Sequence, residues 1–282
     1  MAAWQLAILA LVQGIAELLP ISSSAHVIVA EKLMGIDPTT PQMTLLLVML
    51  HTGTMFAVIA YFWRSWRATY FSSAQAFRTH TLRVVVATAA TGIVGLALLT
   101  LIKRVFAANA SDFEIEALFG NARMIAVALA AVGLLIIFSS RFAKAGSGTA
   151  AVSLGAASWI GAIQGVCLPF RGFSRSGATI SVGMVLGVAR RQAEEFSFVL
   201  GVVLTPAVIV REVHRLHKAQ SALPGAHLEL SHAMAASVAG MVLSFVAGLL
   251  ALRWLSSWLE QGRWHYFGAY CLIASLVVFF AL

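Results

Sequence analysis

The sequence contains few charged residues. Asp, Glu, Lys and Arg together make up 11% of its 282 residues, whereas about 25% is usual for a soluble domain. Hydrophobic residues make up 60% of the chain, and the mean hydropathy is +0.89. This composition excludes an ordinary soluble domain and predicts an integral membrane protein. We expect one membrane domain over residues 1–282, with roughly eight to ten segments of about 20 residues.

Cysteine is also scarce. Cys167 and Cys271 both lie in apolar segments, and their spacing fits neither a zinc site nor a disulfide framework. A cleavable signal peptide is not expected, because Gln13 and Glu17 interrupt the first apolar stretch and no basic region precedes it.

Acidic residues are outnumbered, with 11 Asp and Glu against 19 Lys and Arg, which gives a net charge of +8. In a soluble protein this excess would suggest nucleic-acid binding. In so apolar a chain it is better explained by orientation in a membrane, because Lys and Arg accumulate on the cytoplasmic side. We therefore expect lipid around the chain and no nucleic acid as a partner.

Long apolar runs dominate the chain. Four are long enough to cross a membrane, and two shorter ones are also expected to cross: 44–63, 84–102, 122–140 and 233–252, then 195–210 and 265–282. The other apolar segments form two pairs, each with a polar break. Residues 4–19 and 25–36 flank Leu19-Pro20-Ile21-Ser22-Ser23-Ser24, and residues 152–169 and 179–189 flank Phe170–Ala178. Each pair predicts two half-length helices, whose irregular connection must be surrounded by protein or water.

The two breaks belong to an internal repeat. Val12–Ile15 recurs as Ile163–Val166, Leu19-Pro20 as Leu168-Pro169, and Ser22–Ala25 as Ser174–Gly177, at offsets of 149–152. We predict one half over about residues 1–102 and the other over about 152–252. Residues 122–140 link the halves, and 265–282 form a C-terminal span.

The charge distribution predicts how these halves are oriented. If the first broken pair enters from outside and the second from the cytoplasm, the cytoplasmic segments carry ten basic and three acidic residues. The outer segments then carry seven of each, so the excess of Lys and Arg favours this orientation. The predicted fold is an all-α polytopic membrane protein, with an inverted repeat whose two re-entrant hairpins meet at the midplane.

The first break carries ionisable and hydroxyl side chains. Gln13 and Glu17 are four residues apart and share a helix face. A glutamate at membrane depth is costly unless paired or solvated, which makes Glu17 a functional candidate. Pro20 ends the helix, three serines follow, and His26 falls in the next turn: Ser22, Ser23 and Ser24. Two structural alternatives remain open, since the serines could serve only as helix caps and Glu17 could form an internal salt bridge.

The second break carries two arginines among small and hydroxyl residues. Arg171 and Arg175 lie beside Gly172, Ser174, Ser176, Gly177 and Thr179. Hydroxyls, close backbone approach and the N–H groups of a new helix together favour anions. One acid cannot neutralise two guanidinium groups, so a bound phosphate or diphosphate is expected. The alternative is that Arg175 pairs with Glu17 and is purely structural. If the repeat superposes the breaks, these groups form one pocket at the midplane.

Several histidines lie elsewhere. His51 sits mid-span with Thr52 and Thr54, and it serves either to support the site or to form interhelical hydrogen bonds. A further set lies in a polar segment and is better explained as a solvated face than as a metal site: His214, His217, His227 and His232.

Two long motifs resemble the undecaprenyl-diphosphate phosphatase family linked to bacitracin resistance. They are Gln13–His26 (QGIAELLPISSSAH) and Gly172–Thr179 (GFSRSGAT), and Glu195-Phe196-Ser197-Phe198 resembles the segment after the second motif. The resemblance covers essentially the whole chain. It implies hydrolysis of undecaprenyl diphosphate to the monophosphate, which recycles the lipid carrier for cell-wall synthesis. It also implies a bacterial inner-membrane location, an active site open to the periplasm and a Mg²⁺ or Ca²⁺ cofactor. A homodimer is a further expectation.

By motif position, the resemblance assigns catalytic roles to Glu17, His26 and Arg175. It implies Ser23 as the nucleophile, with His26 as the alternative nucleophile. Glu17 is the expected metal ligand. The other residues of both motifs are expected to bind substrate: Gln13, Ser22, Ser24, Arg171, Gly172, Ser174, Ser176, Gly177 and Thr179.

Three positions differ from the family pattern. Gln13 stands where many members have a second glutamate, Ala25 replaces a common glycine, and Leu168–Gly172 replaces the more usual Trp-Pro-Gly and adds Arg171. The main alternative function is a lipid flippase or transporter, because broken helices in inverted repeats are typical of secondary transporters. A carrier does not need a Ser, His and Glu set beside an arginine, so the enzyme is favoured.

Overall fold

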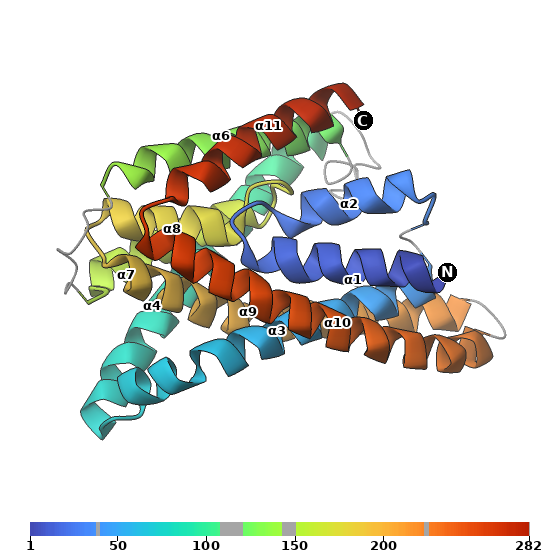
Figure 1. The fold of residues 1–282 in the computed structure, drawn as a ribbon, viewed down its shortest axis with the longest axis horizontal. Helices are drawn as coiled ribbons and strands as arrows, with labels where there is room; N and C mark the ends of the chain where they lie inside the picture. The colour runs from blue at the N-terminus through green and yellow to red at the C-terminus, as the bar shows by residue number, and fades with distance from the viewer. Residues whose placement is uncertain (38–39, 108–120, 143–150, 223–225, 282) are drawn as a thin grey trace. The chain divides into compact units, whose positions relative to one another are not determined.

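The computed structural model describes residues 1–37, 40–107, 121–142, 151–222 and 226–281. Its secondary structure over these ranges is entirely helical (Figure 1). The helices are α1 (Ala3–Leu18), α2 (Ser23–Leu33), α3 (Pro41–Tyr70), α4 (Ala74–Ala107), α6 (Ala122–Ser140), α7 (Leu154–Cys167), α8 (Arg175–Val185), α9 (Arg190–Ala222), α10 (Ala226–Glu260) and α11 (Trp264–Ala281). The all-α prediction is confirmed.

Four helices are long and apolar enough to cross a membrane: Gln42–Tyr70, Ala74–Val105, Ala122–Ser140 and Met234–Glu260. They correspond to the four long runs predicted from the sequence, to within one residue at 233, and the chain is a multi-pass membrane protein. Large apolar side chains stay exposed on these helices, as lipid contact requires; Ile93 is 70% exposed. The shorter run 195–210 falls in α9, and residues 265–281 of the other run fall in α11. Their crossing of the membrane stays a prediction.

Both predicted breaks interrupt a pair of packed helices. α1 ends at Leu18 and α2 begins at Ser23, while α7 ends at Cys167 and α8 begins at Arg175. The two helices of each pair pack against each other. Both second helices begin earlier than predicted, by two and four residues. In α8 the reason is Ser174, whose hydroxyl caps the helix by accepting from the Gly177 N–H at 3.2 Å.

The chain divides into two compact units. The first comprises Met1–Leu18, Ser23–Trp63 and Gly201–Leu255, and the second comprises Leu19–Ser22, Arg64–Leu200 and Ser256–Leu282. Each unit takes residues from both halves of the predicted repeat. The boundaries of those halves, their inverted orientation and the re-entrance of the two hairpins stay predictions.

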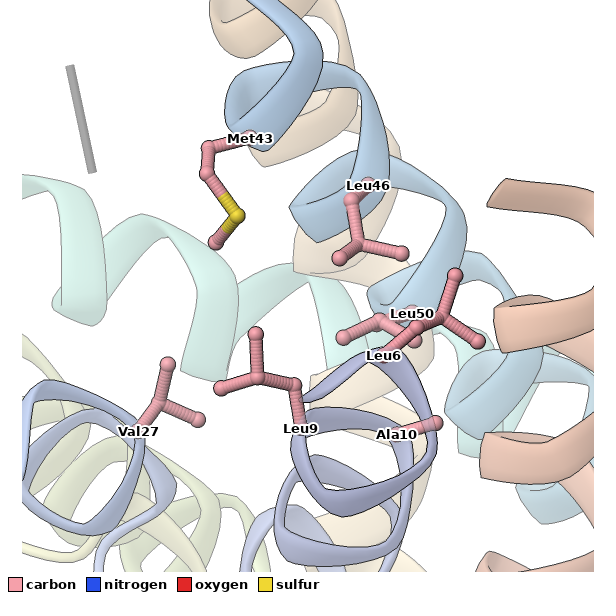
Figure 2. Packing of buried hydrophobic residues seen from close by; sticks show 7 residues of the cluster. All are labelled: Leu6, Leu9, Ala10, Val27, Met43, Leu46 and Leu50. Atoms are coloured by element: carbon pink, nitrogen blue, oxygen red, sulfur yellow. The ribbon is translucent and has the colours of Figure 1, made fainter. Parts of the chain in front are cut away.

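In the first unit, an apolar cluster holds α1 against α2 and α3 (Figure 2): Leu6, Leu9, Ala10, Val27, Met43, Leu46 and Leu50. α10 approaches α1 closely at Gly14, where a Cβ atom would lie 2.6 Å from the Cβ of Ala247. The Ser244 hydroxyl also donates to the Leu50 carbonyl at 3.0 Å. This packing fixes the helix face that carries Gln13 and Glu17.

In the second unit, buried polar contacts join the helices around α8. Trp264 of α11 donates from Nε1 to the hydroxyls of Ser139 and Ser181, at 3.1 and 3.2 Å. α7 packs on α4, where Gln164 donates to the Thr91 hydroxyl at 3.1 Å and Thr91 donates to the Gly161 carbonyl at 2.9 Å. These bonds satisfy groups that could not meet water inside a membrane, and they position the helix that begins with Arg175.

Candidate active site

Glu17 and Ser23 form a direct hydrogen bond in the first unit. The Ser23 hydroxyl donates to Glu17 Oε2 at 2.5 Å, and Gln13 Nε2 donates to the same oxygen at 3.1 Å. The predicted sharing of a face by Gln13 and Glu17 is confirmed. Ser23 does more than cap a helix, because its hydroxyl is bonded to a carboxylate that can take its proton.

His51 of α3 lies beside this pair. Its Nδ1 donates to the Leu47 carbonyl at 2.8 Å, and its Nε2 lies 3.9 Å from Glu17 Oε2. Because a carbonyl oxygen can only accept, the hydrogen is on Nδ1 and the Nε2 edge faces the carboxylate. The threonines beside it bond to carbonyls of their own helix, Thr52 to Val48 and Thr54 to His51. These hydrogen bonds lie within α3, and the approach to Glu17 joins His51 to α1. The supporting role of His51 therefore stays a prediction.

The first break has a constrained backbone. Ser22 is 6% exposed and has φ of 68°, a left-handed conformation that residues other than glycine rarely adopt. Ala25 lies inside α2 and is buried, so its replacement of glycine involves no positive φ. Ser24 and His26 lie in the first turn of α2, both partly exposed.

Groups of the second unit bond to the backbone of this break. The Ser176 hydroxyl donates to the Leu19 carbonyl at 3.3 Å, and the Cys271 thiol donates to the Pro20 carbonyl at 3.3 Å. A Cβ atom on Gly177 would lie 3.2 Å from the Pro20 Cβ. The irregular backbone is thus surrounded by protein, as expected for a break at membrane depth.

The second break forms a buried helix start around Arg175. Gly172 has φ of 99°, and a Cβ there would lie 2.6 Å from the Ile125 carbonyl, so only glycine fits. Ser174 and Ser176 are buried, with their hydroxyl oxygens 3.4 Å apart. Arg175 is partly buried, and its Nη1 donates to the Ser197 carbonyl at 3.2 Å. A guanidinium and hydroxyls at a helix N-terminus are the groups that an anion site requires.

The remaining predicted site residues of the second break lie close to Arg175 in the chain. Arg171 is partly buried beside Gly172. Thr179 is fully buried, and its hydroxyl donates to the Arg175 carbonyl at 2.7 Å. Glu17 and Ser23 belong to the first unit and Arg175 to the second, so the shared pocket and the Arg175–Glu17 pair stay predictions.

The donor set limits the kind of metal site that could form. The described residues contain no cluster of three or more His, Cys, Asp or Glu side chains that could hold a metal ion. Mg²⁺ nevertheless commonly binds through one or two protein oxygens together with substrate phosphates. Glu17 and the adjacent Gln13 amide fit such a site.

Of the four histidines in the polar segment, His214 is exposed, and the side chains of His217, His227 and His232 lie outside those described.

A second pair of carboxylates lies near the start of α9, where the expected span 195–210 begins. Glu194 is 2% exposed and accepts from the Ser256 hydroxyl at 2.6 Å. Glu195 accepts from the Ser65 hydroxyl at 2.6 Å and from Arg191 Nε at 3.0 Å. These bonds fasten the first turn of α9 to its neighbours within the second unit.

The stability of the protein is expected to depend on pH through Glu194. Burial raises the pKa of this carboxyl from 4.5 to about 8, although the Ser256 hydrogen bond opposes the rise. Between these values the folded chain keeps a proton that the unfolded chain loses, so a rise in pH lowers the free energy of unfolding. We expect the Tm in detergent to fall by several degrees from about pH 6 to about pH 8. Glu194→Gln should flatten this dependence, and parallel curves for the two proteins would contradict the assignment.

Together these features define a polytopic helical membrane protein with a carboxylate–hydroxyl pair at one helix break and an arginine-bearing helix start at another. The chain belongs to the family described as bacitracin resistance protein BacA, whose profile matches residues 6–277. It is 61% identical over 272 residues to undecaprenyl-diphosphatase 2 of Acinetobacter baylyi. The alignment covers 96% of this chain and 95% of that relative. It is 34% identical over 289 residues to undecaprenyl-diphosphatase 2 of Burkholderia orbicola, and that alignment covers 98% of this chain and 95% of that relative. The family predicted from the two motifs is confirmed.

Proposed function

We propose that this protein hydrolyses undecaprenyl diphosphate to undecaprenyl phosphate and inorganic phosphate. The observation that carries the proposal is the 2.5 Å hydrogen bond from the Ser23 hydroxyl to Glu17 Oε2. It supplies a nucleophile already bonded to a base, at a break between two apolar helices. The names of the relatives, at up to 61% identity over nearly the whole chain, support the same reaction.

In the proposed mechanism, the Ser23 oxygen attacks the terminal phosphorus and Glu17 takes the hydroxyl proton. The new O–P bond replaces the bridging P–O bond, and undecaprenyl phosphate leaves. Glu17 passes this proton to the departing undecaprenyl phosphate and is a base again. Water then attacks the phosphoserine and gives a proton to Glu17, which returns it to the Ser23 oxygen as the serine P–O bond breaks and inorganic phosphate is released. His26, in the same helix turn, is the alternative nucleophile and is otherwise a proton carrier.

The second break holds the terminal phosphate in this proposal. Arg175 and the N–H groups at the start of α8 would bind its oxygens as negative charge redistributes, and such electrostatic stabilisation usually contributes most to the catalysis of phosphoryl transfer. Several residues predicted to bind substrate form hydrogen bonds within the protein: Ser176 to the Leu19 carbonyl, Thr179 to the Arg175 carbonyl, and the Gly177 N–H to the Ser174 hydroxyl. Of these bonds, the one from Thr179 supports Arg175 directly. Direct binding of substrate by these residues remains a proposal.

Mg²⁺ or Ca²⁺ is the proposed cofactor. The Glu17 carboxylate and the Gln13 side-chain oxygen would hold it together with substrate phosphate oxygens. When bound, the ion would neutralise part of the diphosphate charge. The proposed setting is the bacterial inner membrane, with the site open to the periplasm, and a homodimer is the proposed assembly.

The function is tested by measuring inorganic phosphate release from undecaprenyl diphosphate by purified protein in detergent. We expect release with Mg²⁺ or Ca²⁺ and loss of release in EDTA. No release from a folded protein with either ion would reject the phosphatase. Lipid movement across vesicles without hydrolysis would instead support the flippase, which broken helix pairs also suit.

Ser23→Ala tests the covalent step. We expect phosphate release to fall at least about 100-fold, because the nucleophile is removed while the backbone is kept. Rapid acid quenching of the wild-type reaction, followed by mass spectrometry, should find phosphate on Ser23. Full activity of Ser23→Ala would transfer the nucleophilic role to His26 or to water.

A further inference from the structure

The segment Glu195-Phe196-Ser197-Phe198 follows the second break in the sequence, and the proposed chemistry gives it no role. It lies in the first two turns of α9, in the same unit as Arg175. Ser197 is fully buried and Phe198 is 1% exposed. Both residues contact Arg175 directly.

Two contacts define how the guanidinium lies. Its Nη1 donates to the Ser197 carbonyl at 3.2 Å, and its Cζ lies 5.9 Å from the centroid of the Phe198 ring. That distance is within the range of a cation–π interaction, which is stronger where water is excluded. A guanidinium has five N–H donors in a rigid plane. The bond to Ser197 and the aromatic ring therefore both orient this plane.

A buried hydroxyl network holds the backbone of Arg175 to the same turn of α9. The Thr179 hydroxyl donates to the Arg175 carbonyl at 2.7 Å and lies 2.6 Å from the Ser197 hydroxyl. This short contact joins the two hydroxyls directly, and either oxygen can be the donor. Both the backbone and the side chain of Arg175 are thus attached to Ser197, through its hydroxyl and its carbonyl.

The start of α9 is itself fastened. Glu194 and Glu195 accept hydrogen bonds from Ser256 and Ser65, each at 2.6 Å. The Phe198 ring is one turn further along the same helix. Side chains on such anchored helices hold a site more closely than side chains on loops.

We propose that Phe198 is a positioning residue for Arg175. This inference rests on the proposed function, in which Arg175 holds the terminal phosphate. Its ring limits the rotamers of the guanidinium before the diphosphate binds, so less conformational freedom is lost on binding and in the transition state. Ser197 and Phe198, in the segment after the second motif, thus support the arginine.

The test combines Phe198→Leu with a matched control and a double-mutant cycle. We expect Phe198→Leu to lower kcat/KM for phosphate release about tenfold, in line with a desolvated cation–π contact. Phe196, 4% exposed on the same helix, provides the control, and Phe196→Leu should stay within about twofold of wild type. In an Arg175→Ala background, Phe198→Leu should cost less than about twofold, because the partner is gone. Equal losses in both backgrounds would show a merely structural role and overturn the proposal.

A binding measurement decides the proposal independently of turnover. Calorimetry with methylenediphosphonate, a diphosphate analogue whose P–C–P link cannot be hydrolysed, gives the Kd of wild type, Phe198→Leu and Phe196→Leu. We expect about tenfold weaker binding for Phe198→Leu alone; equal Kd values for Phe198→Leu and wild type would overturn the proposal. Phe198→Met replaces Phe198→Leu if the latter loses its size-exclusion peak or its Tm. Wild type that releases no phosphate would reject the proposed function, while this binding comparison would still decide the role of Phe198.

Discussion

Replacing Arg175 by Ala is expected to lower phosphate release from undecaprenyl diphosphate at least about 100-fold. The guanidinium is partly buried at the start of α8, held by the Ser197 carbonyl and the Phe198 ring. Its loss removes the fixed positive charge on which the proposed mechanism depends. Initial rates over a range of substrate concentrations should show a fall in kcat as well as in kcat/KM, because the contact strengthens in the transition state.

Two further variants serve as comparisons for the Arg175→Ala result. Arg175→Lys keeps the charge but loses the planar, two-pronged geometry, so we expect an intermediate rate. Arg64→Ala removes an exposed arginine of α3 and should leave the rate unchanged. Near-normal turnover of a folded Arg175→Ala protein would reject the second break as the phosphate site.

Glu17→Gln is expected to abolish phosphate release. The substitution keeps the size of the side chain and an oxygen that can accept from Ser23, but it removes the base and the one carboxylate proposed as a metal ligand. A general base contributes about 100- to 10,000-fold, and loss of the metal adds to that. Phosphate release with Mg²⁺ or Ca²⁺, run beside wild type and an EDTA control, measures the effect.

Glu260→Gln is the matched control for Glu17→Gln, since Glu260 is an exposed carboxylate at the end of α10. It should release phosphate at the wild-type rate. If Glu17→Gln also kept more than a tenth of that rate, a different group would have to accept the Ser23 proton.

Much of this arrangement could be predicted from local sequence. Pro20 cannot continue a helix, and the break it predicts lies between Leu18 and Ser23. The four-residue spacing of Gln13 and Glu17 fixes their common face, and the structure joins them by a hydrogen bond. These features depend on one helix and its ends, which is why periodicity and helix-ending residues reveal them.

Tertiary contacts could not be predicted in the same way. His51 is one of several polar residues in a long apolar helix, and nothing in its own segment indicates that its Nε2 faces Glu17, 34 positions earlier. The role of Phe198 likewise depends on the packing of α9 beside Arg175. The left-handed φ of Ser22 could not be predicted either, because serine, unlike glycine, does not indicate that conformation.

The carbonyls of the first break bear on how the protein is made. The Leu19 carbonyl has a local partner in the Ile21 N–H, but the Pro20 carbonyl accepts from the Cys271 thiol, which is 251 residues further along the chain. A peptide carbonyl without a partner is costly in lipid. The N-terminal hairpin therefore cannot reach its final bonding when it first enters the membrane. It must stay hydrated or shielded until α11 has been inserted, so the first break is completed only after the helices that follow it.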